Sequence, residues 1–422
     1  MTTSPTIRVP GGVRRGGRVL SIVLPAVMLL SAVAPPVAPP AGPAARVDAA
    51  AAGRRPLEVI RAPAGTAIPN RYIVRLRPGG LTADVVIPLD VRPDFVYQQV
   101  ISGFTANMSP EQIGEVLSHP EVAAVEEDGV VRAFGPGPAP VAGRGAPDLT
   151  TSWGLDRIDQ RSLPLNGRYD VTHTGAGVTA YIVDSGIDPA NKDFTGRLVP
   201  GFSAVTDQRG TGDCLGHGTS VAGIVGGTSW GVARKVKLAP VRVLGCDGSG
   251  AYSGVIAGLD WIAKNAARPA VVNVSLGGPK SPSVNEAANG LAREGIFVAA
   301  AAGNAFSNAC DVSPASAPGI LTVGASTRVD GQAIFSNTGP CVDVFAPGLA
   351  VTTSKAGGGS RVGNGTSFAA PYATGVAALY KQARGDAQSA VLENWLVREA
   401  TSDELKGIPE NTSNKLLYTG GL

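Results

Sequence analysis

Apolar runs of strand length alternate with stretches of helical periodicity from Trp153 to the end of the chain. The apolar runs cover residues 178–184, 236–244, 271–276, 296–302 and 320–325. The helical stretches cover about 217–227, 252–266, 283–294, 367–382 and 386–398. Strands that are apolar on both faces and separated by helices are typical of a parallel sheet covered by helices on both sides. The pattern therefore predicts an α/β domain with three layers and a mostly parallel central sheet.

A smaller pattern precedes this domain, from Ile68 to Val131. Its predicted strands are Arg71–Arg77, Gln99–Met108 and Val122–Val125, and its predicted helix runs from Ser109 to about Ser118. Ser109 is a favourable N-cap, and the proline that follows suits the first turn of a helix. These elements predict a small α+β domain at residues 68–132.

Segments of biased composition flank the smaller domain. Arginines between positions 14 and 18 precede an apolar stretch, Val19–Ala34, whose 16 residues are short for a membrane span. A charged start, an apolar middle and small residues after it are typical of a secretory signal, which we assign to residues 1–45. An N-terminal membrane anchor is the alternative. Residues 46–67 and 133–147 are rich in small residues, glycine and proline, and are predicted linkers.

The composition narrows the class of protein. Hydrophobic residues make up 44% of the 422-residue chain and charged residues 16%, as in globular proteins. The net charge is +3, and Lys and Arg never form runs interleaved with aromatic residues, so the sequence does not favour a nucleic-acid partner. We expect a secreted monomer with no stable membrane insertion once the signal is removed.

The chain contains four cysteines: Cys214, Cys246, Cys310 and Cys341. An even number in an exported protein suggests disulfides, and four cysteines allow three connectivities. We favour Cys214–Cys246 and Cys310–Cys341, which close loops of similar, moderate length. A zinc site is the competing interpretation, but it would need closely spaced cysteines or several histidines nearby.

Histidine is informative because the chain has only three, His119, His173 and His217. His217 lies between Gly216 and Gly218 at the start of a predicted helix, where glycines let other backbone and a substrate approach the imidazole. Without further context, a lone structural histidine would be the more common interpretation. If the protein uses a histidine base, His217 is the candidate.

Three other polar residues lie at the ends of predicted elements. Ser367 opens an apolar helix, whose free N–H groups could stabilise an oxyanion. Asp184 ends a strand and could orient an imidazole. Asn304 follows another strand and could donate its amide to an oxyanion. Each alone could be a helix cap or a turn residue. In a parallel sheet, however, these positions and His217 converge on the carboxyl edge of the strands, where ligands bind.

Together these motifs resemble the subtilase family, with the chain order Asp, His, Ser. The resemblance covers residues 68 to 418, and the chain is similar to the proteinase K branch and its aqualysin-like members. The residues that carry this closer match are Trp153–Gln160, Asp247–Gly250, Ser275–Gly278, Ser313–Ser316 and the cysteine positions. The chain departs from the family pattern at Ser220, Phe368, Ala370 and Tyr372, none of which is a triad residue.

The resemblance implies a subtilisin-like fold and a serine endopeptidase that works through an acyl-enzyme. Ser367 would be the nucleophile, His217 the base and Asp184 its orienting group, with Asn304 and the Ser367 N–H as the oxyanion hole. Residues 68–132 would be a propeptide that acts as chaperone and inhibitor, with self-cleavage within Arg132–Ala146 and a catalytic domain at 148–422.

Substrate-binding positions also follow from the resemblance. A peptide would add as a strand between Gly248-Ser249-Gly250 and Ser275-Leu276-Gly277. The pocket for the P1 side chain, which precedes the cleaved bond, would be floored by Ala301, Ala302 and Gly303. Because these segments contain no charge, the sequence predicts apolar or aromatic P1 residues.

Calcium is the expected cofactor, in a structural role. Asp156, Asp159 and Gln160 are spaced so that one helical turn would present three oxygen ligands together. The resemblance to the family implies further ligands near Asn166, and it also implies a second site that would use Asp343 with the carbonyls of Pro318 and Ile320. Solvated carboxylates are the alternative interpretation.

Two other classes of function remain open at this point. An α/β-hydrolase esterase would need a second glycine after the nucleophile and the chain order Ser, Asp, His, and the sequence has neither. A secreted binding module or an inactive protease would carry a damaged triad or oxyanion hole, whereas all four candidate residues are present.

Overall fold

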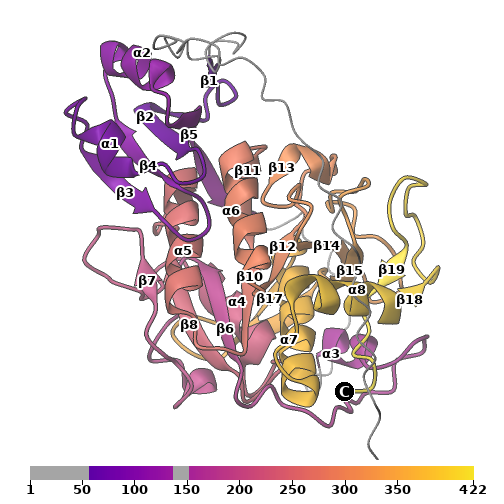
Figure 1. The fold of residues 1–422 in the computed structure, drawn as a ribbon. Helices are drawn as coiled ribbons and strands as arrows, with labels where there is room; N and C mark the ends of the chain where they lie inside the picture. The colour runs from indigo at the N-terminus through magenta and orange to yellow at the C-terminus, as the bar shows by residue number, and fades with distance from the viewer. Residues whose placement is uncertain (1–56, 136–151) are drawn as a thin grey trace, which may run out of the picture. The chain divides into compact units, whose positions relative to one another are not determined.

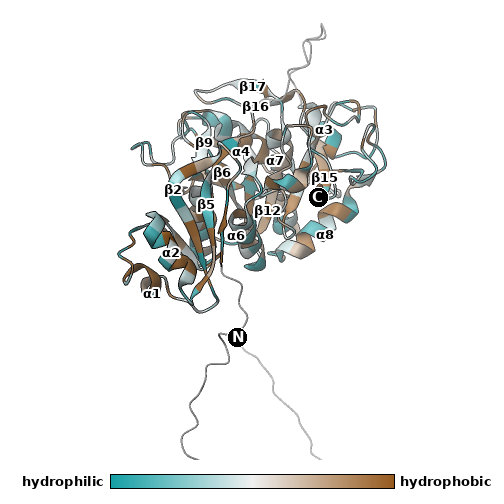
Figure 2. Cartoon of the chain, turned by 90° about the horizontal axis from the view of Figure 1, so that it is seen from above, coloured by the Kyte–Doolittle hydropathy of each residue, from teal (hydrophilic) through white to brown (hydrophobic). Residues whose placement is uncertain are grey.

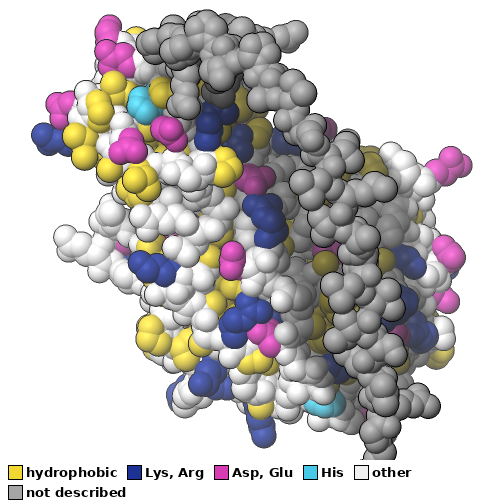
Figure 3. Space-filling view, in the orientation of Figure 1, with side chains coloured by type: hydrophobic (Ala, Val, Ile, Leu, Met, Phe, Trp, Pro, Cys, Tyr) yellow, Lys and Arg dark blue, Asp and Glu magenta, His cyan; other side chains and the backbone are white. Residues whose placement is uncertain are grey.

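The computed structural model describes residues 57–135 and 152–422. The predicted signal at 1–45, half of the predicted linker at 46–67 and most of the one at 133–147 lie outside the described residues. The described half of the first linker carries the short strand β1 (Val59–Ile60) and the first residue of β2 (Ala67–Leu76). Within the described ranges, no helix is both long enough and apolar enough to cross a bilayer. Lys and Arg side chains are scattered among Asp and Glu on the face shown in Figure 3.

A nine-stranded sheet forms the centre of the larger domain, as the hydrophobic pattern predicts (Figure 1). Its strands, in spatial order, are β18 (Thr401–Ser402), β19 (Lys415–Leu416), β15 (Val344–Pro347), β14 (Leu321–Ser326), β12 (Phe297–Ala301), β10 (Ala270–Val274), β6 (Thr179–Asp184), β8 (Lys237–Arg242) and β7 (Phe202–Ser203). Every neighbouring pair is parallel except β18 and β19. The predicted α/β class is therefore confirmed.

Helices cover both faces of this sheet, because its strands are apolar on both sides. Along β6, Ala180 and Ile182 pack into one core, and Tyr181 and Val183 pack into the other. The helices that contribute to the first core are α3 (Trp153–Ile158), α4 (His217–Gly226), α7 (Thr366–Arg384) and α8 (Ser389–Glu399). Those of the second core are α5 (Tyr252–Asn265) and α6 (Pro282–Arg293). Figure 2 shows apolar strands such as β6 and β12 enclosed between these helices.

The smaller domain is α+β, as predicted. Its elements are β1 (Val59–Ile60), β2 (Ala67–Leu76), α1 (Thr82–Val86), β3 (Pro93–Tyr97), β4 (Gly103–Asn107), α2 (Pro110–Ser118) and β5 (Val122–Ala133). Ser109 and Gln112 form a reciprocal capping box at the start of α2. Three boundaries differ from the prediction by three residues or more: the strand expected from Arg71 starts at Ala67, the one expected from Gln99 starts at Gly103, and the one expected to end at Val125 continues to Ala133.

The extended strand β5 joins the two domains into one irregular eight-stranded sheet. The first part of β5 pairs with β2. Its last residues, 130–133, lie between β9 (Ser249–Ala251) and β11 (Leu276–Pro279). The remaining short elements are β13 (Val312–Ser313), the hairpin β16 (Val351–Ser354) and β17 (Ser360–Gly363), and the 3-10 helices η1 (Lys192–Phe194) and η2 (Ala309–Asp311). The end of β5 is therefore held next to the carboxyl edge of the central sheet.

Candidate active site

Asp184 and His217 meet at the carboxyl edge of the central sheet. Asp184 is the last residue of β6 and is completely buried, while His217 is the first residue of α4. The imidazole Nδ1 lies 2.8 Å from Asp184 Oδ1 and 2.9 Å from Oδ2. Asp184 Oδ1 also accepts a hydrogen bond from the Ser185 N–H. This geometry fixes the imidazole with Nδ1 as the donor and leaves Nε2 as the basic nitrogen.

The surroundings of His217 favour its protonated form. Burial alone would lower the pKa of the imidazole, but the charge and hydrogen bond of Asp184 outweigh burial and raise the pKa above its usual value. The buried Nε2 has no hydrogen-bond partner among the described residues. The ring edge of Phe368 packs against the imidazole, with centroids 6.1 Å apart. The unpaired nitrogen is therefore available to take a proton.

Ser367 lies in the first turn of α7, at the same sheet edge. Its Oγ is 3.3 Å from the carbonyl oxygen of Ser275, to which it donates. No hydrogen bond joins Ser367 Oγ to His217 Nε2, as is often found in serine enzymes without substrate. The preceding Gly365 has φ of 142°, and a side chain there would come within 2.8 Å of the Asn304 amide. Glycine is therefore needed at the entrance to this helix.

The Asn304 amide is oriented by a residue that the sequence reasoning missed. Asn304 Oδ1 accepts from both the N–H and the hydroxyl of Thr366, each at 2.8 Å. Nδ2 is thereby turned outward and donates to the carbonyl oxygen of Gly135 at 3.0 Å. Thr366 Oγ1 also accepts from the Gly303 N–H. The predicted floor residues Ala301 and Ala302 are fully buried beside this network.

The end of β5 occupies the strand positions that the sequence predicts for a substrate. Ala133 N–H donates to the Gly248 carbonyl at 2.9 Å, and Arg132 pairs with Ser249 on one side and Gly277 on the other. Val131 pairs with Gly250, and Ala133 with Leu276. The Phe134 ring lies so close to Gly277 that a Cβ at that glycine would be 2.5 Å from it. A cavity of about 270 Å³ beside this segment is lined by residues that include Phe134, Gly135, His217, Arg361 and Phe368.

Carboxylates stabilise the contact between the small domain and the larger domain. Asp128 accepts from the Ser253 N–H and hydroxyl at the start of α5, and Glu126 accepts from the Ser283 N–H at the start of α6. In return, Asp260 on α5 accepts from three consecutive backbone N–H groups, those of residues 98–100. Helix N-termini favour negative charge. This explains why β5 continues through the acidic residues 126–128, although the strand was predicted to end before them.

The first set of predicted calcium ligands contains unpaired oxygens. Asp156 accepts from the N–H groups of Asn166 and Gly167, whereas Asp159 Oδ1 and Gln160 Oε1 are buried and have no hydrogen-bond partner within residues 57–135 and 152–422. Burial, together with the charge of Asp156, raises the pKa of Asp159 to about 6. One detail of the prediction is wrong: the helix ends at Ile158, so one regular helical turn does not carry all three ligands.

The second predicted set lies between β15, β14 and α8. Asp343 Oδ2 accepts from the Thr322 N–H, and burial raises the pKa of Asp343 to about 6. Burial and the charge of Asp343 raise the pKa of Glu393 to about 7. Glu393 and Pro318 line one cavity, and Ile320 directly precedes β14. The structure therefore brings a second carboxylate near Asp343 that the sequence did not indicate.

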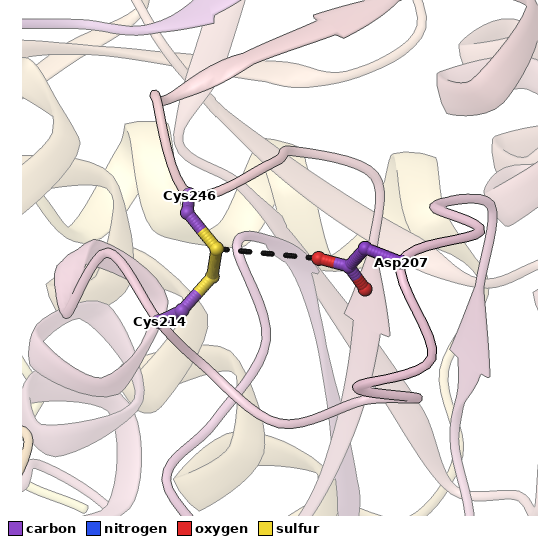
Figure 4. A group of neighbouring side chains, drawn as sticks. All are labelled: Asp207, Cys214 and Cys246. Carbon is purple, nitrogen blue, oxygen red and sulfur yellow. Dashed lines mark hydrogen bonds between the residues drawn. A yellow bond between two sulfur atoms is a disulfide. The ribbon is translucent and has the colours of Figure 1, made fainter.

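All four cysteines form disulfides, Cys214–Cys246 and Cys310–Cys341, in the favoured connectivity. The first bond ties the loop before His217 to the turn before Gly248. Asp207 lies beside it (Figure 4). Because disulfide sulfurs are not available as thiolate ligands, the zinc interpretation is excluded.

Comparisons with known proteins agree with this geometry. The model of the subtilase family matches residues 175–416, and the model of peptidase inhibitor I9 matches residues 92–134. The chain is 41% identical over 398 residues to an extracellular serine proteinase of Thermus sp. (strain Rt41A), covering 88% of this chain and 94% of the relative. It is 39% identical over 379 residues to alkaline serine exoprotease A of Vibrio alginolyticus, covering 86% and 70%. The crystal structure of a cold-adapted subtilisin-like serine proteinase is 44% identical, with a TM-score of 0.63 over 64% of this chain and 98% of that chain.

Proposed function

The chain belongs to the subtilase family of serine endopeptidases, and from that premise we propose that it is a secreted, self-processing endopeptidase with Asp184, His217 and Ser367 as its triad. The observation that carries the proposal is the paired Asp184 and His217, with a free Nε2, at the sheet edge where Ser367 opens α7. The extracellular serine proteinase to which it is 41% identical supports secretion.

The chemistry follows from the positions of these groups. Ser367 Oγ attacks the peptide carbonyl while His217 Nε2 takes the hydroxyl proton, and Asp184 stabilises the imidazolium. The charge that develops on the carbonyl oxygen is held by the Asn304 amide and the Ser367 N–H at the start of α7. His217 returns the proton to the leaving amine, and water then attacks the acyl-enzyme.

We expect the P1 pocket to favour apolar or aromatic side chains. The support comes from the chain itself, because the Phe134 ring lies against Gly277, and the predicted floor residues Ala301 and Ala302 are buried and uncharged. A charged P1 side chain would lose its hydration there without gaining an ionic partner.

The same segment supports a specific maturation bond, Phe134–Gly135. In the observed register, Ala133 and Arg132 are paired with Leu276 and Gly277, so Phe134 is the next residue toward Ser367. The Asn304 amide, however, donates to the carbonyl of Gly135 rather than to that of Phe134. Cleavage after Gly135 would leave the P1 pocket without a side chain, and the bond broken would be the tertiary amide to Pro136, with the secondary amine of that proline as the leaving group. We therefore favour Phe134–Gly135.

Purified precursor tests this assignment directly. After incubation, the N-terminus of the mature enzyme is expected at Gly135, as measured by Edman sequencing and intact mass. Phe134→Asp should slow processing at this bond by about 10-fold or more, since it buries a charge in the apolar pocket, whereas Phe134→Leu should process normally. A mature N-terminus at Pro136 would instead make Gly135 the P1 residue, and a terminus far beyond it would contradict the register argument.

We also propose structural calcium at both carboxylate sets. The unpaired, buried oxygens of Asp159 and Gln160 are the observation that fits a hard cation, because such oxygens are calcium's preferred ligands. Asp156 and Asn166 would complete this set, and Asp343 would hold a second ion with Glu393 and the carbonyls of Pro318 and Ile320. Bound calcium would supply only charge neutralisation and cross-linking of loops.

Chelation is expected to destabilise the enzyme more at pH 8 than at pH 5. Without the cation, raised pKa values near 6 for Asp159 and Asp343 mean that the native state retains protons that the unfolded chain has already lost, so stability falls as the pH rises through this range. Saturating calcium at pH 8 should raise Tm by about 10 °C, measured by calorimetry with and without EDTA. Asp159→Asn and Asp343→Asn should each remove part of the difference. The same Tm with and without EDTA at pH 8 would exclude both sites.

A further inference from the structure

Asp213, four residues before His217, has a carboxylate that accepts hydrogen bonds from five donor groups. Oδ1 accepts from the Ser185 hydroxyl at 2.9 Å, the Leu215 N–H at 2.9 Å and the Gly216 N–H at 2.8 Å. Oδ2 accepts from the N–H and the hydroxyl of Thr219, at 2.9 and 2.5 Å. An ordinary turn aspartate binds one or two nearby N–H groups, so this carboxylate organises a much larger part of the loop.

The donors come from both chain segments that carry the catalytic pair. Ser185 directly follows Asp184, while Gly216 and Thr219 flank His217 on either side. The Ser185 hydroxyl also accepts from the N–H of Gly218 at 2.9 Å, which closes a ring between the end of β6 and the first turn of α4. The distance between Asp184 and His217 is thus set by a hydrogen-bond network centred on Asp213, whose own atoms make no hydrogen bond to the imidazole.

The charge of Asp213 acts on the same imidazole. Three charged groups influence His217: Asp184 from β6, Asp213 from the preceding loop, and the exposed Arg361 from β17. The two carboxylates favour the imidazolium, whereas the Arg361 guanidinium opposes it. Because the carboxylate of Asp213 already satisfies five donors, it stays close to His217 in a fixed position throughout the proton transfer.

We propose that Asp213 is a positioning residue for catalysis. It holds the Asp184 carboxylate and the His217 imidazole at hydrogen-bonding distance, and its charge stabilises the imidazolium without direct contact. The proposal rests on the triad assigned above. It goes beyond that assignment because Asp213 touches neither the substrate nor the reacting atoms. It also differs from a purely structural role, because a loop aspartate that only supported the fold would not alter the protonation of His217.

The test is the pH dependence of Asp213→Asn, with Asp213→Glu and Arg361→Gln as comparisons. For a short peptide amide, Asp213→Asn should lower kcat by about 10- to 100-fold with KM changed less than threefold, because the imidazole loses its alignment. The acidic limb of kcat/KM reports the His217 pKa in the free enzyme. It should shift to lower pH in Asp213→Asn and to higher pH in Arg361→Gln, while Asp213→Glu should restore the position of the limb.

Control measurements separate this idea from misfolding and from failure of the triad. If Asp213→Asn matures too slowly to yield purified mature enzyme, the pH dependence of the rate at which its precursor processes itself replaces steady-state kinetics. Calorimetry of the Ser367→Ala precursor with and without Asp213→Asn measures the effect on folding alone. An acidic limb that stays in place, or a loss confined to Tm, would overturn the positioning role. If the Ser367→Ala enzyme is active, the triad assignment itself fails, which is a separate result.

Discussion

Replacing Ser367 with alanine is expected to abolish both peptide hydrolysis and maturation, with turnover falling by about 10⁶-fold. That magnitude is borrowed from a subtilase in which the nucleophile was removed. The physical reason is that the proposed mechanism uses Ser367 Oγ to attack the carbonyl, and without this hydroxyl His217 has no proton to accept. Casein hydrolysis and intact mass before and after incubation measure the two effects.

The matched control is Ser229→Ala, an exposed serine on another loop, which should process and digest as the unaltered enzyme does. The Ser367→Ala precursor should keep its full mass and remain folded, since the Asp128, Glu126 and Asp260 contacts of the small domain do not involve the nucleophile. Processing of Ser367→Ala at the normal rate would show that another group is the nucleophile or that a contaminating protease cleaves the linker.

Much of the fold could be predicted from the sequence, because local physics determines it. The strand β6 is a run of buried, largely apolar residues from Ala180 to Val183, and Ser109 with Gln112 caps α2 through atoms three residues apart. The catalytic candidates could be predicted for the same reason: Asp184, His217 and Ser367 each mark the end or start of an element at one edge of the sheet.

The features that were missed depend on contacts between distant residues. The acidic residues Glu126 and Asp128 looked like the end of a strand, yet β5 continues because both carboxylates are satisfied at helix N-termini more than 120 residues away. Neither the Thr366 contacts that orient Asn304 nor the closeness of Glu393 to Asp343 has any periodic signal in the sequence. The helix α3 likewise ends at Ile158, and its Asp156 accepts from the N–H groups of Asn166 and Gly167, contacts that have no periodic signal in the sequence.

Replacing Asn304 with leucine is expected to lower kcat by about 10²- to 10³-fold with little change in KM. The amide Nδ2 donates to the bound segment, at 3.0 Å from the Gly135 carbonyl oxygen, and leucine has a similar volume but no donor. The loss falls on kcat because the hydrogen bond strengthens as the carbonyl oxygen gains charge. Steady-state kinetics on a peptide amide separate the two parameters.

The orientation of Asn304 complicates this experiment, because leucine also removes Oδ1, the acceptor for both donors of Thr366. Two further variants separate the roles. Asn304→Asp keeps an acceptor for Thr366 but replaces the donor with a negatively charged oxygen, so it should lose at least as much kcat as leucine. Thr366→Val removes the hydroxyl but leaves its N–H bonded to Oδ1, so it should cost much less than Asn304→Leu. If Thr366→Val is as impaired as Asn304→Leu, the asparagine acts by shaping the start of α7, and the oxyanion must be stabilised by backbone N–H groups alone.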